Sequence, residues 1–239
     1  MNKVFKAFVD FDGTITKSDV GEAIFREFGN TEKVNGIIEK LLSDEISAKE
    51  CWLSLCGSVE NFDQKSLDDF IGTMEIDETF PGFVKYCESS GIELFVLSDG
   101  FDYYIKKIFE REKLQNLNVY SNKLVITSDN KLIPEFPYLD ANFKTSANCK
   151  RNHIINHSGD DEFTVFIGDG NSDKETALIC DFIFAKDGLL RHCEMERITF
   201  FPFENFNDVI ERMEKLSAKK RLKKRYQAEL KRKELYIRE

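Results

Sequence analysis

Three short polar segments carry the residue types in this sequence that could do chemistry. They are Asp10–Thr14, Ser98–Gly100 and Gly168–Asp173, and each contains glycine and follows a short apolar run. Such runs are typical of buried parallel strands, and ligands of open α/β sheets bind beside the carboxyl ends of the strands. The three segments are therefore predicted to converge on one site, and this convergence is stronger evidence than any single motif.

The first segment has the ligands of a metal site. Asp10 and Asp12 stand two residues apart, so both carboxylates face one side if the chain stays extended. Two like charges in one partly buried site repel, and a divalent cation removes this conflict. Hard carboxylate oxygens favour Mg²⁺. The alternative is a solvated acidic turn after an edge strand, but chance rarely produces the whole run Asp10–Thr14.

The elements that must hold these segments alternate between strand and helix after about residue 80. Apolar runs predict buried strands at 4–9, 92–97, 163–167 and 182–185, and a hairpin is predicted from 119–127 and 131–136. Helices are predicted over 81–90, 101–112, 146–157, 171–180 and 207–216. This alternation implies a parallel sheet with right-handed crossovers.

A helical block interrupts this pattern after the first strand. Residues 18–75 show apolar residues at helical spacing, and Ser47 with Glu50 forms a capping-box signature. We therefore predict an α/β fold with a Rossmann-like parallel sheet core, an inserted all-helical cap domain and a small β-hairpin. The predicted bounds are 1–16 and 78–216 for the core, 17–77 for the cap and 217–239 for a basic helical tail.

Charge and composition exclude several classes of protein. The net charge is −9, but residues 219–239 hold ten Lys and Arg against three Glu, which leaves −16 on the rest. An acidic body argues against nucleic-acid binding. The absence of a long apolar stretch or signal sequence argues against a membrane protein, and six scattered cysteines are typical of reduced thiols in the cytoplasm. The tail, with a weak leucine stripe, is expected to be a solvated helix.

Four motifs in order resemble those of the haloacid dehalogenase superfamily. Asp10–Thr14 is similar to the first motif, Ser98 to the second and Lys150 to the third. Gly168–Asp173 is similar to the fourth, the acidic metal motif. Together they cover most of residues 4–185, so the chain is identified as a member of this superfamily. The resemblance implies a Mg²⁺-dependent phosphatase that acts on a small phosphorylated metabolite.

The resemblance also implies roles for the acidic residues. Asp10 would attack phosphorus to give an aspartyl phosphate. Asp12 would protonate the leaving oxygen and then deprotonate the hydrolytic water. The Mg²⁺ ligands would be the Asp10 carboxylate, the Asp12 carbonyl, Asp169, and Asp173 either directly or through water.

Substrate-binding roles are implied for other motif residues. Ser98 and Lys150 would hold the phosphoryl oxygens, with added N–H donors from Asp99 and Gly100. Lys144 competes with Lys150 for the basic role. Lys150 is favoured because it lies at the start of the helix that leads into the last motif's strand.

The position of the cap implies the branch that contains phosphoserine phosphatase. That branch places a Glu for the substrate amino group nine residues after the nucleophile, where this chain has Asp19, and no cap Arg for a carboxylate is evident. Ile46–Glu50 and the pair Cys149–Lys150 are similar to phosphatases of the methionine-salvage enol phosphate. Asp19 is thus a candidate substrate contact. Phosphoserine remains an alternative substrate.

Two other functions stay open. A phosphotransferase or phosphomutase could use the same residues, with a sugar hydroxyl in place of water. An interaction protein could act through the basic tail, in which case the motifs would have no catalytic use.

Overall fold

The computed structural model describes residues 3–59, 63–142 and 146–236, and the chain forms two compact units. The first unit consists of Met1–Ile15, Ile76–Leu97 and Lys150–Glu239. The second unit consists of Thr16–Glu75 and Ser98–Cys149. The segment predicted as a cap thus shares a unit with 98–149, which the sequence analysis placed in the core.

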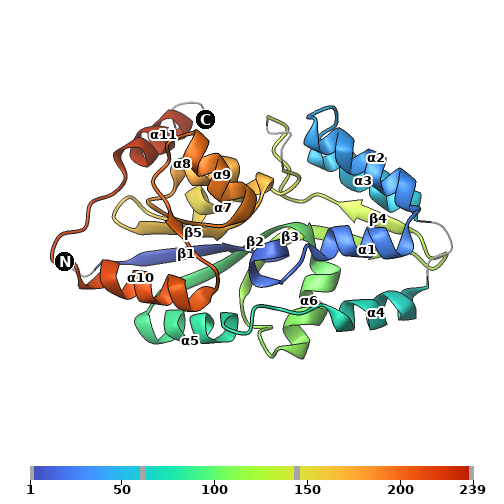
Figure 1. Ribbon diagram of the computed structural model, residues 1–239, viewed down its shortest axis with the longest axis horizontal. Helices are drawn as coiled ribbons and strands as arrows, with labels where there is room; N and C mark the ends of the chain where they lie inside the picture. The colour runs from blue at the N-terminus through green and yellow to red at the C-terminus, as the bar shows by residue number, and fades with distance from the viewer. Residues whose placement is uncertain (1–2, 60–62, 143–145, 237–239) are drawn as a thin grey trace. The chain divides into compact units, whose positions relative to one another are not determined.

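The sheet has seven strands in the order β4-β3-β2-β1-β5-β6-β7, and most of them are parallel (Figure 1). The strands are β1 (Phe5–Asp10), β2 (Glu93–Phe101), β3 (Asn118–Ile126), β4 (Leu132–Glu135), β5 (Phe163–Gly168), β6 (Phe182–Ala185) and β7 (Phe201–Pro202). The hairpin β3–β4 is antiparallel. β1 is central: Ala7 is opposite Leu94 on one side and Val165 on the other. Because both faces of β1 are covered, its sequence is nearly continuous in apolar residues.

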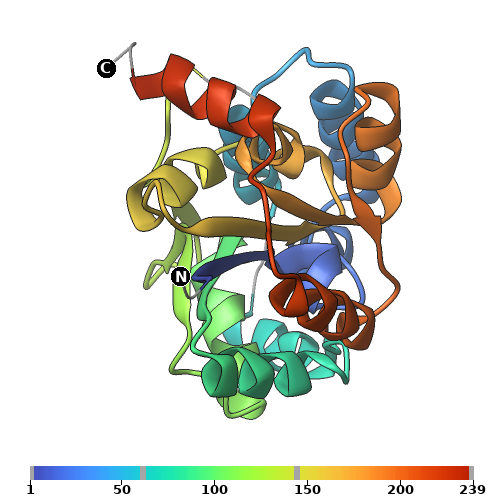
Figure 2. The same ribbon diagram turned by 90° about the vertical axis from the view of Figure 1, so that its left-hand side faces the viewer.

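Helices cover both faces of the sheet in the first unit (Figures 1 and 2). α5 (Phe80–Ser90) and α10 (Phe206–Ala218) lie on one face. α7 (Lys150–His157), α8 (Lys174–Ile179) and α11 (Tyr226–Tyr236) lie on the other, and α9 (Asp187–Met195) follows β6. Phe206 of α10 packs against Phe80 and Phe83 of α5, with ring centroids 4.9 and 5.3 Å apart. These buried rings contribute to the core through apolar area and ring geometry.

The second unit is mainly helical. It contains α1 (Val20–Phe28), α2 (Thr31–Leu42), α3 (Ala48–Ser58), α4 (Gln64–Thr73), α6 (Asp102–Arg111) and the hairpin β3–β4. The capping box of Ser47 and Glu50 is present at the start of α3. Trp52 of α3 packs against Phe101, with ring centroids 4.8 Å apart. Within the described residues of both units, no helix is long and apolar enough to cross a membrane.

The structure differs from the predicted elements at several points. The helix predicted over 146–157 begins only at Lys150, because the Ala147 and Asn148 N–H groups donate to the Asp99 carboxylate. The strand predicted to stop at 97 continues to Phe101. The short elements α9 and β7 were not predicted.

The basic tail is not the solvated helix that its sequence predicts. Ala228 and Arg232 of α11 are buried, and the Arg232 guanidinium donates to the Ile179 carbonyl and to the Asp181 carboxylate. Asp181 also accepts hydrogen bonds from the N–H and hydroxyl of Thr164. The prediction was wrong because a leucine stripe is not the only way to dock a helix: a buried arginine on a buried carboxylate does so here.

We expect Arg232→Ala to lower the free energy of unfolding by about 2–4 kcal/mol, since it removes a partner of the buried Asp181 carboxylate. Chemical denaturation measures this loss. The exposed neighbour Lys233 provides the matched control, and Lys233→Ala should change stability by less than about 0.5 kcal/mol. Equal effects of the two substitutions would contradict the docking role of Arg232.

Candidate active site

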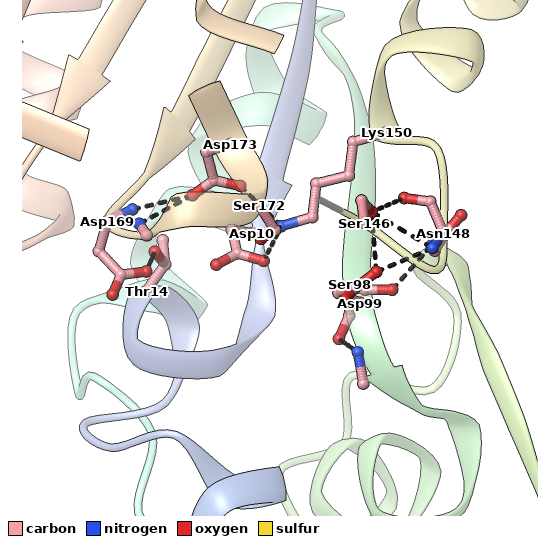
Figure 3. Close-up of polar contacts among 12 residues, drawn as sticks. Asp10, Thr14, Ser98, Asp99, Ser146, Asn148, Lys150, Asp169, Ser172 and Asp173 are labelled. Atoms are coloured by element: carbon pink, nitrogen blue, oxygen red, sulfur yellow. Dashed lines mark hydrogen bonds and ion pairs between the residues drawn. The ribbon is translucent and has the colours of Figure 1, made fainter. Parts of the chain in front are cut away.

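The carboxyl ends of two neighbouring strands bring three aspartates together. Asp10 ends β1, Asp169 follows β5, and Asp173 closes the short helical turn η2 (Asn171–Asp173). Because β1 and β5 are adjacent and parallel, their ends lie at one edge of the sheet. Carboxylate oxygens of the three residues lie within 4.8 Å of one another (Figure 3). The predicted first and fourth motifs therefore meet in the first unit.

Lys150 brings the third motif to the same cluster. It is the first residue of α7 and is 2% exposed. Its ammonium group donates to the Asp10 carboxylate, to Asp173 Oδ1 at 2.6 Å and to Ser172 Oγ at 3.0 Å. Such charge-assisted hydrogen bonds fix the lysine tightly. Its competitor, Lys144, lies outside the described residues.

Backbone and hydroxyl donors hold the acidic side chains in place. Asp173 Oδ2 accepts hydrogen bonds from the N–H groups of Asp169 and Gly170 at 3.2 and 3.0 Å. The Asp173 side chain is thereby bonded to the backbone of the loop that precedes it. The Thr14 hydroxyl donates to Asp169 Oδ1 at 2.7 Å and links the first motif to the fourth. These contacts leave each carboxylate with a defined orientation.

Gly13 is required by both conformation and space. Its φ is +77°, and a Cβ atom there would lie 2.5 Å from Asp169 Oδ2. Any other residue would be strained and would push Asp169 away from its position. The glycine of the first motif therefore allows the close approach of the turn Phe11–Ile15 to the acidic loop.

One ammonium group faces three carboxylates in a buried place, and the excess negative charge shifts the pKa values. Burial and the neighbouring Asp173 raise the pKa of Asp10 well above its ordinary value, and Lys150 only partly opposes this. Burial and Asp173 raise the pKa of Asp169 to about 6. Burial alone would lower the pKa of Lys150, but Asp10 and Asp173 raise it above its ordinary value. The single ammonium group of Lys150 therefore does not balance the negative charge of the three carboxylates.

A divalent cation fits this cluster. All three candidate ligands are carboxylates, which are the donors that Mg²⁺ and Ca²⁺ prefer. Added positive charge would offset the repulsion that raises the pKa values of Asp10 and Asp169. The residues present therefore fit a hard metal ion.

We expect Mg²⁺ to raise the melting temperature of the protein more at pH 7.5 than at pH 5.5, by about 3 °C or more. The native pKa of Asp169, about 6, exceeds its ordinary value of 3.8. The protonated Asp169 therefore stabilises the metal-free protein at low pH, and this stabilisation is lost as the pH rises from 3.8 to about 6. The metal competes with the protons of Asp10 and Asp169 and binds best at a pH where both carboxylates are ionised. Thermal melts with and without Mg²⁺ measure the effect, and Asp169→Asn should remove most of the pH dependence. A metal-induced shift that is equal at both pH values would contradict the cluster as the binding site.

Asp12 is not one of the three aspartates in this group. It is half-buried in the turn that follows β1, with φ −73° and ψ 121°, an extended conformation. The metal ligand expected from Asp12 is its backbone carbonyl, and that role stays a prediction.

Ser98 and Asp99, both labelled in Figure 3, form a second polar cluster with Gly100, in the second unit. The Gly100 N–H donates to Ser98 Oγ at 2.9 Å, and the Asp99 carboxylate accepts from the segment 146–148. Ser98 directly follows Leu97, the residue opposite Asp10 in the β1–β2 ladder. The substrate contacts predicted for Ser98, Asp99 and Gly100 stay predictions.

Asp19 has a structural role that sequence reasoning did not assign. It is exposed and caps α1, where its carboxylate accepts from the Glu22 N–H at 2.7 Å. An aspartate before an apolar helical stretch is an N-cap signal, so the sequence contained this information. Its predicted contact with substrate stays a prediction.

Sequence reasoning also missed residues that bind other site residues. Thr14 belongs to the first motif, Asp10–Thr14, but its hydrogen bond to Asp169 has no sequence signal because the two residues are 155 positions apart. Ser146 and Asn148, which bond to the Ser98–Gly100 segment, were predicted as ordinary helix residues.

Comparisons with known proteins agree with this architecture. Two relatives are each 29% identical to the chain. The alignment with 2-hydroxy-3-keto-5-methylthiopentenyl-1-phosphate phosphatase of Bacillus mycoides covers 88% of this chain and 96% of that protein. The alignment with Pdp3-interacting factor 1 of Schizosaccharomyces pombe covers 90% of this chain and 96% of that protein. A phosphoserine phosphatase structure, described as a phospho-aspartyl intermediate analogue, matches with a TM-score of 0.68 at 20% identity over 89% of this chain and 99% of that one. This match confirms the predicted fold class.

The family comparison bears directly on the predicted motifs. A model of the haloacid dehalogenase-like hydrolases matches residues 7–178, a range that includes Asp10, Ser98, Lys150 and Asp173. The match confirms the resemblance inferred from the sequence and supports the predicted phosphatase. The chain belongs to the haloacid dehalogenase-like hydrolase family.

Proposed function

We propose that this protein is a Mg²⁺-dependent phosphomonoesterase of the cytoplasm that acts through an aspartyl phosphate on Asp10. The observation that carries the proposal is the buried cluster of Asp10, Asp169 and Asp173 around Lys150 at the carboxyl ends of β1 and β5. Family membership and the phosphatase names of relatives support the same reaction class.

The proposed reaction has two steps. A carboxylate oxygen of Asp10 forms a bond to phosphorus while the ester P–O bond breaks, and the leaving oxygen takes a proton from Asp12. Asp12 then accepts a proton from water, whose oxygen bonds to phosphorus. The bond between Asp10 and phosphorus breaks, and inorganic phosphate leaves with the enzyme restored.

The surrounding residues prepare Asp10 for this attack. Lys150 donates to Asp10 and favours its ionised form, and Asp173 holds the lysine in position. Asp10, Asp169 and Asp173 would hold Mg²⁺, which when bound supplies positive charge for the phosphoryl oxygens. For Ser98, Asp99 and Gly100 we keep the sequence-based proposal that they bind those oxygens.

Phosphate release tests this function. The purified protein is incubated with a panel of small phosphate esters, with Mg²⁺ or with EDTA. We expect Mg²⁺-dependent release that continues over many turnovers. Transfer of phosphate to sugar hydroxyls without net release would instead indicate a phosphotransferase or phosphomutase on the same site.

For the substrate, we propose a small phosphate ester with an uncharged tail, with the methionine-salvage enol phosphate as the first candidate. The relative from Bacillus mycoides carries the name of that phosphatase. Two cations of the helical segment are candidates for binding a substrate carboxylate: Arg26 donates to Glu22 and Asn35, each at 2.6 Å, and Lys49 is exposed. This placement of Arg26 and Lys49 favours a substrate without a carboxylate.

We therefore expect kcat/KM for the enol phosphate to exceed that for phosphoserine by more than about tenfold, or roughly 1.4 kcal/mol. A zwitterion would lose hydration at both charges without gaining ionic partners. Side-by-side assays at saturating Mg²⁺, which also include sugar and keto phosphates, measure the ratio. A preference for phosphoserine would assign the chain to the alternative, phosphoserine phosphatase, and leave the phosphatase reaction intact.

A further inference from the structure

The Asp99 carboxylate is the centre of a hydrogen-bond network inside the second unit. Its Oδ1 atom accepts from the Ser146 hydroxyl at 2.8 Å and from the N–H groups of Ala147 and Asn148 at 2.6 and 2.8 Å. Its Oδ2 atom accepts from the Trp52 indole N–H at 3.4 Å. The side chain of Asp99 thus bonds to the protein itself (Figure 3).

A buried amide completes the network from the other side. Asn148 is fully buried, and its Nδ2 group donates to the carbonyls of Ser98 and Tyr120 at 2.7 and 2.9 Å. Nδ2 of Asn122 donates to the Asp99 carbonyl at 2.6 Å. The backbone of 98–99 and the segment 146–148 are therefore held to each other in both directions.

This arrangement explains why 146–148 is not helical. A carboxylate oxygen with three donors is a strong local anchor, because each hydrogen bond is charge-assisted. It takes two backbone N–H groups that would otherwise belong to a helix or to water. The segment therefore keeps one conformation up to Cys149, and the next residue is Lys150, the first residue of α7.

We infer that the Asp99 side chain is a positioning residue: it fixes the segment that leads into Lys150 against the turn that carries Ser98. The inference rests on the proposed function, in which Ser98 and Lys150 bind the phosphoryl group. Trp52 joins helix α3 to the same carboxylate but contributes a longer, single hydrogen bond. The three hydrogen bonds accepted by Oδ1 are the essential contacts. An acceptor oxygen at this position therefore matters more than the negative charge of the side chain.

Two substitutions separate these contacts. Asp99→Ala removes the four hydrogen bonds described above, and we expect kcat to fall about 100-fold with KM changed less than about threefold, because small misplacements of reacting groups cost about this much. Asp99→Asn keeps one carbonyl oxygen for the three donors but places its NH₂ group toward the Trp52 N–H. It should recover kcat to within about tenfold of the wild type. Trp52→Phe, which keeps an aromatic ring but loses the indole N–H together with part of the ring system, is the control and should stay within about threefold.

Hydrogen exchange tests the positioning without any turnover. The Ala147 and Asn148 amides should exchange at least about tenfold faster in Asp99→Ala and at the wild-type rate in Trp52→Phe. If Asp99→Ala does not fold, Asp99→Ser replaces it, because its shorter side chain cannot reach all three donors. Unchanged exchange in Asp99→Ala, or in Asp99→Ser where it replaces that variant, would overturn the inference whether or not the wild type releases phosphate.

The kinetic outcomes are equally decisive. Equal losses of kcat in Asp99→Ala and Asp99→Asn, or a loss confined to KM, would make the Asp99 side chain a direct substrate contact and overturn its positioning role. Absence of phosphate release by the wild type would refute the proposed function alone, since the exchange rates would still decide the role of Asp99.

Discussion

Asp10→Asn is expected to lower kcat by at least roughly 10⁴-fold while the fold stays intact. The amide is nearly isosteric with the carboxylate but is a poor nucleophile and a weaker metal ligand. Burial beside Asp173 and Asp169 raises the pKa of Asp10, so the neutral amide also removes repulsion. We expect the metal-free variant to be at least as stable as the wild type and to gain less from Mg²⁺. Phosphate-release kinetics and thermal melts give both values.

Asp12→Asn provides the contrast within the same motif. Attack by Asp10 can still occur with a good leaving group, whereas activation of water is lost. Phosphorylated protein should therefore accumulate in Asp12→Asn and not in Asp10→Asn, as intact-mass measurement would show. Near-normal turnover by Asp10→Asn would overturn the aspartyl-phosphate mechanism.

Lys150→Ala is expected to lower kcat by about 10²–10³-fold, because it removes the fixed cation beside Asp10. It also leaves two buried carboxylates, those of Asp10 and Asp173, without their ammonium partner. The metal-free variant should therefore be less stable than the wild type at pH 7.5 and should recover part of the difference at pH 5.5, where protons neutralise the cluster. Turnover assays and thermal melts at the two pH values measure these effects.

Lys144→Ala is the comparison for this prediction, since Lys144 is the other lysine that the sequence offers for the third motif. We expect its kcat to stay within a few-fold of the wild type. A larger loss in Lys144→Ala than in Lys150→Ala would transfer the phosphoryl-binding role to Lys144.

The sequence by itself determined the catalytic class and the framework of the first unit. Strands β1 and β5 are buried on both faces, so their continuous apolar runs identified them, and the polar residues that end them had to meet at one edge of the sheet. Local signals were equally readable: the capping box of Ser47 lies where it was predicted, and the helix predicted over 81–90 ends at Ser90, before the left-handed Gly91. These features depend on neighbours in sequence or on strand topology alone.

Only the tertiary structure decided which polar side chains bond to one another. Lys150 was preferred to Lys144 by its place in the chain, but its contacts with Asp10 and Asp173 depend on how α7 packs. The basic tail reads as solvated until Arg232 is seen on Asp181, 51 residues away in sequence. The side chain of Asp99 likewise has no partner that the sequence reveals, and its donors in 146–148 are known only from the folded chain. Hydrogen bonds between distant residues leave no periodicity in the sequence, so their partners become known only when the chain has folded.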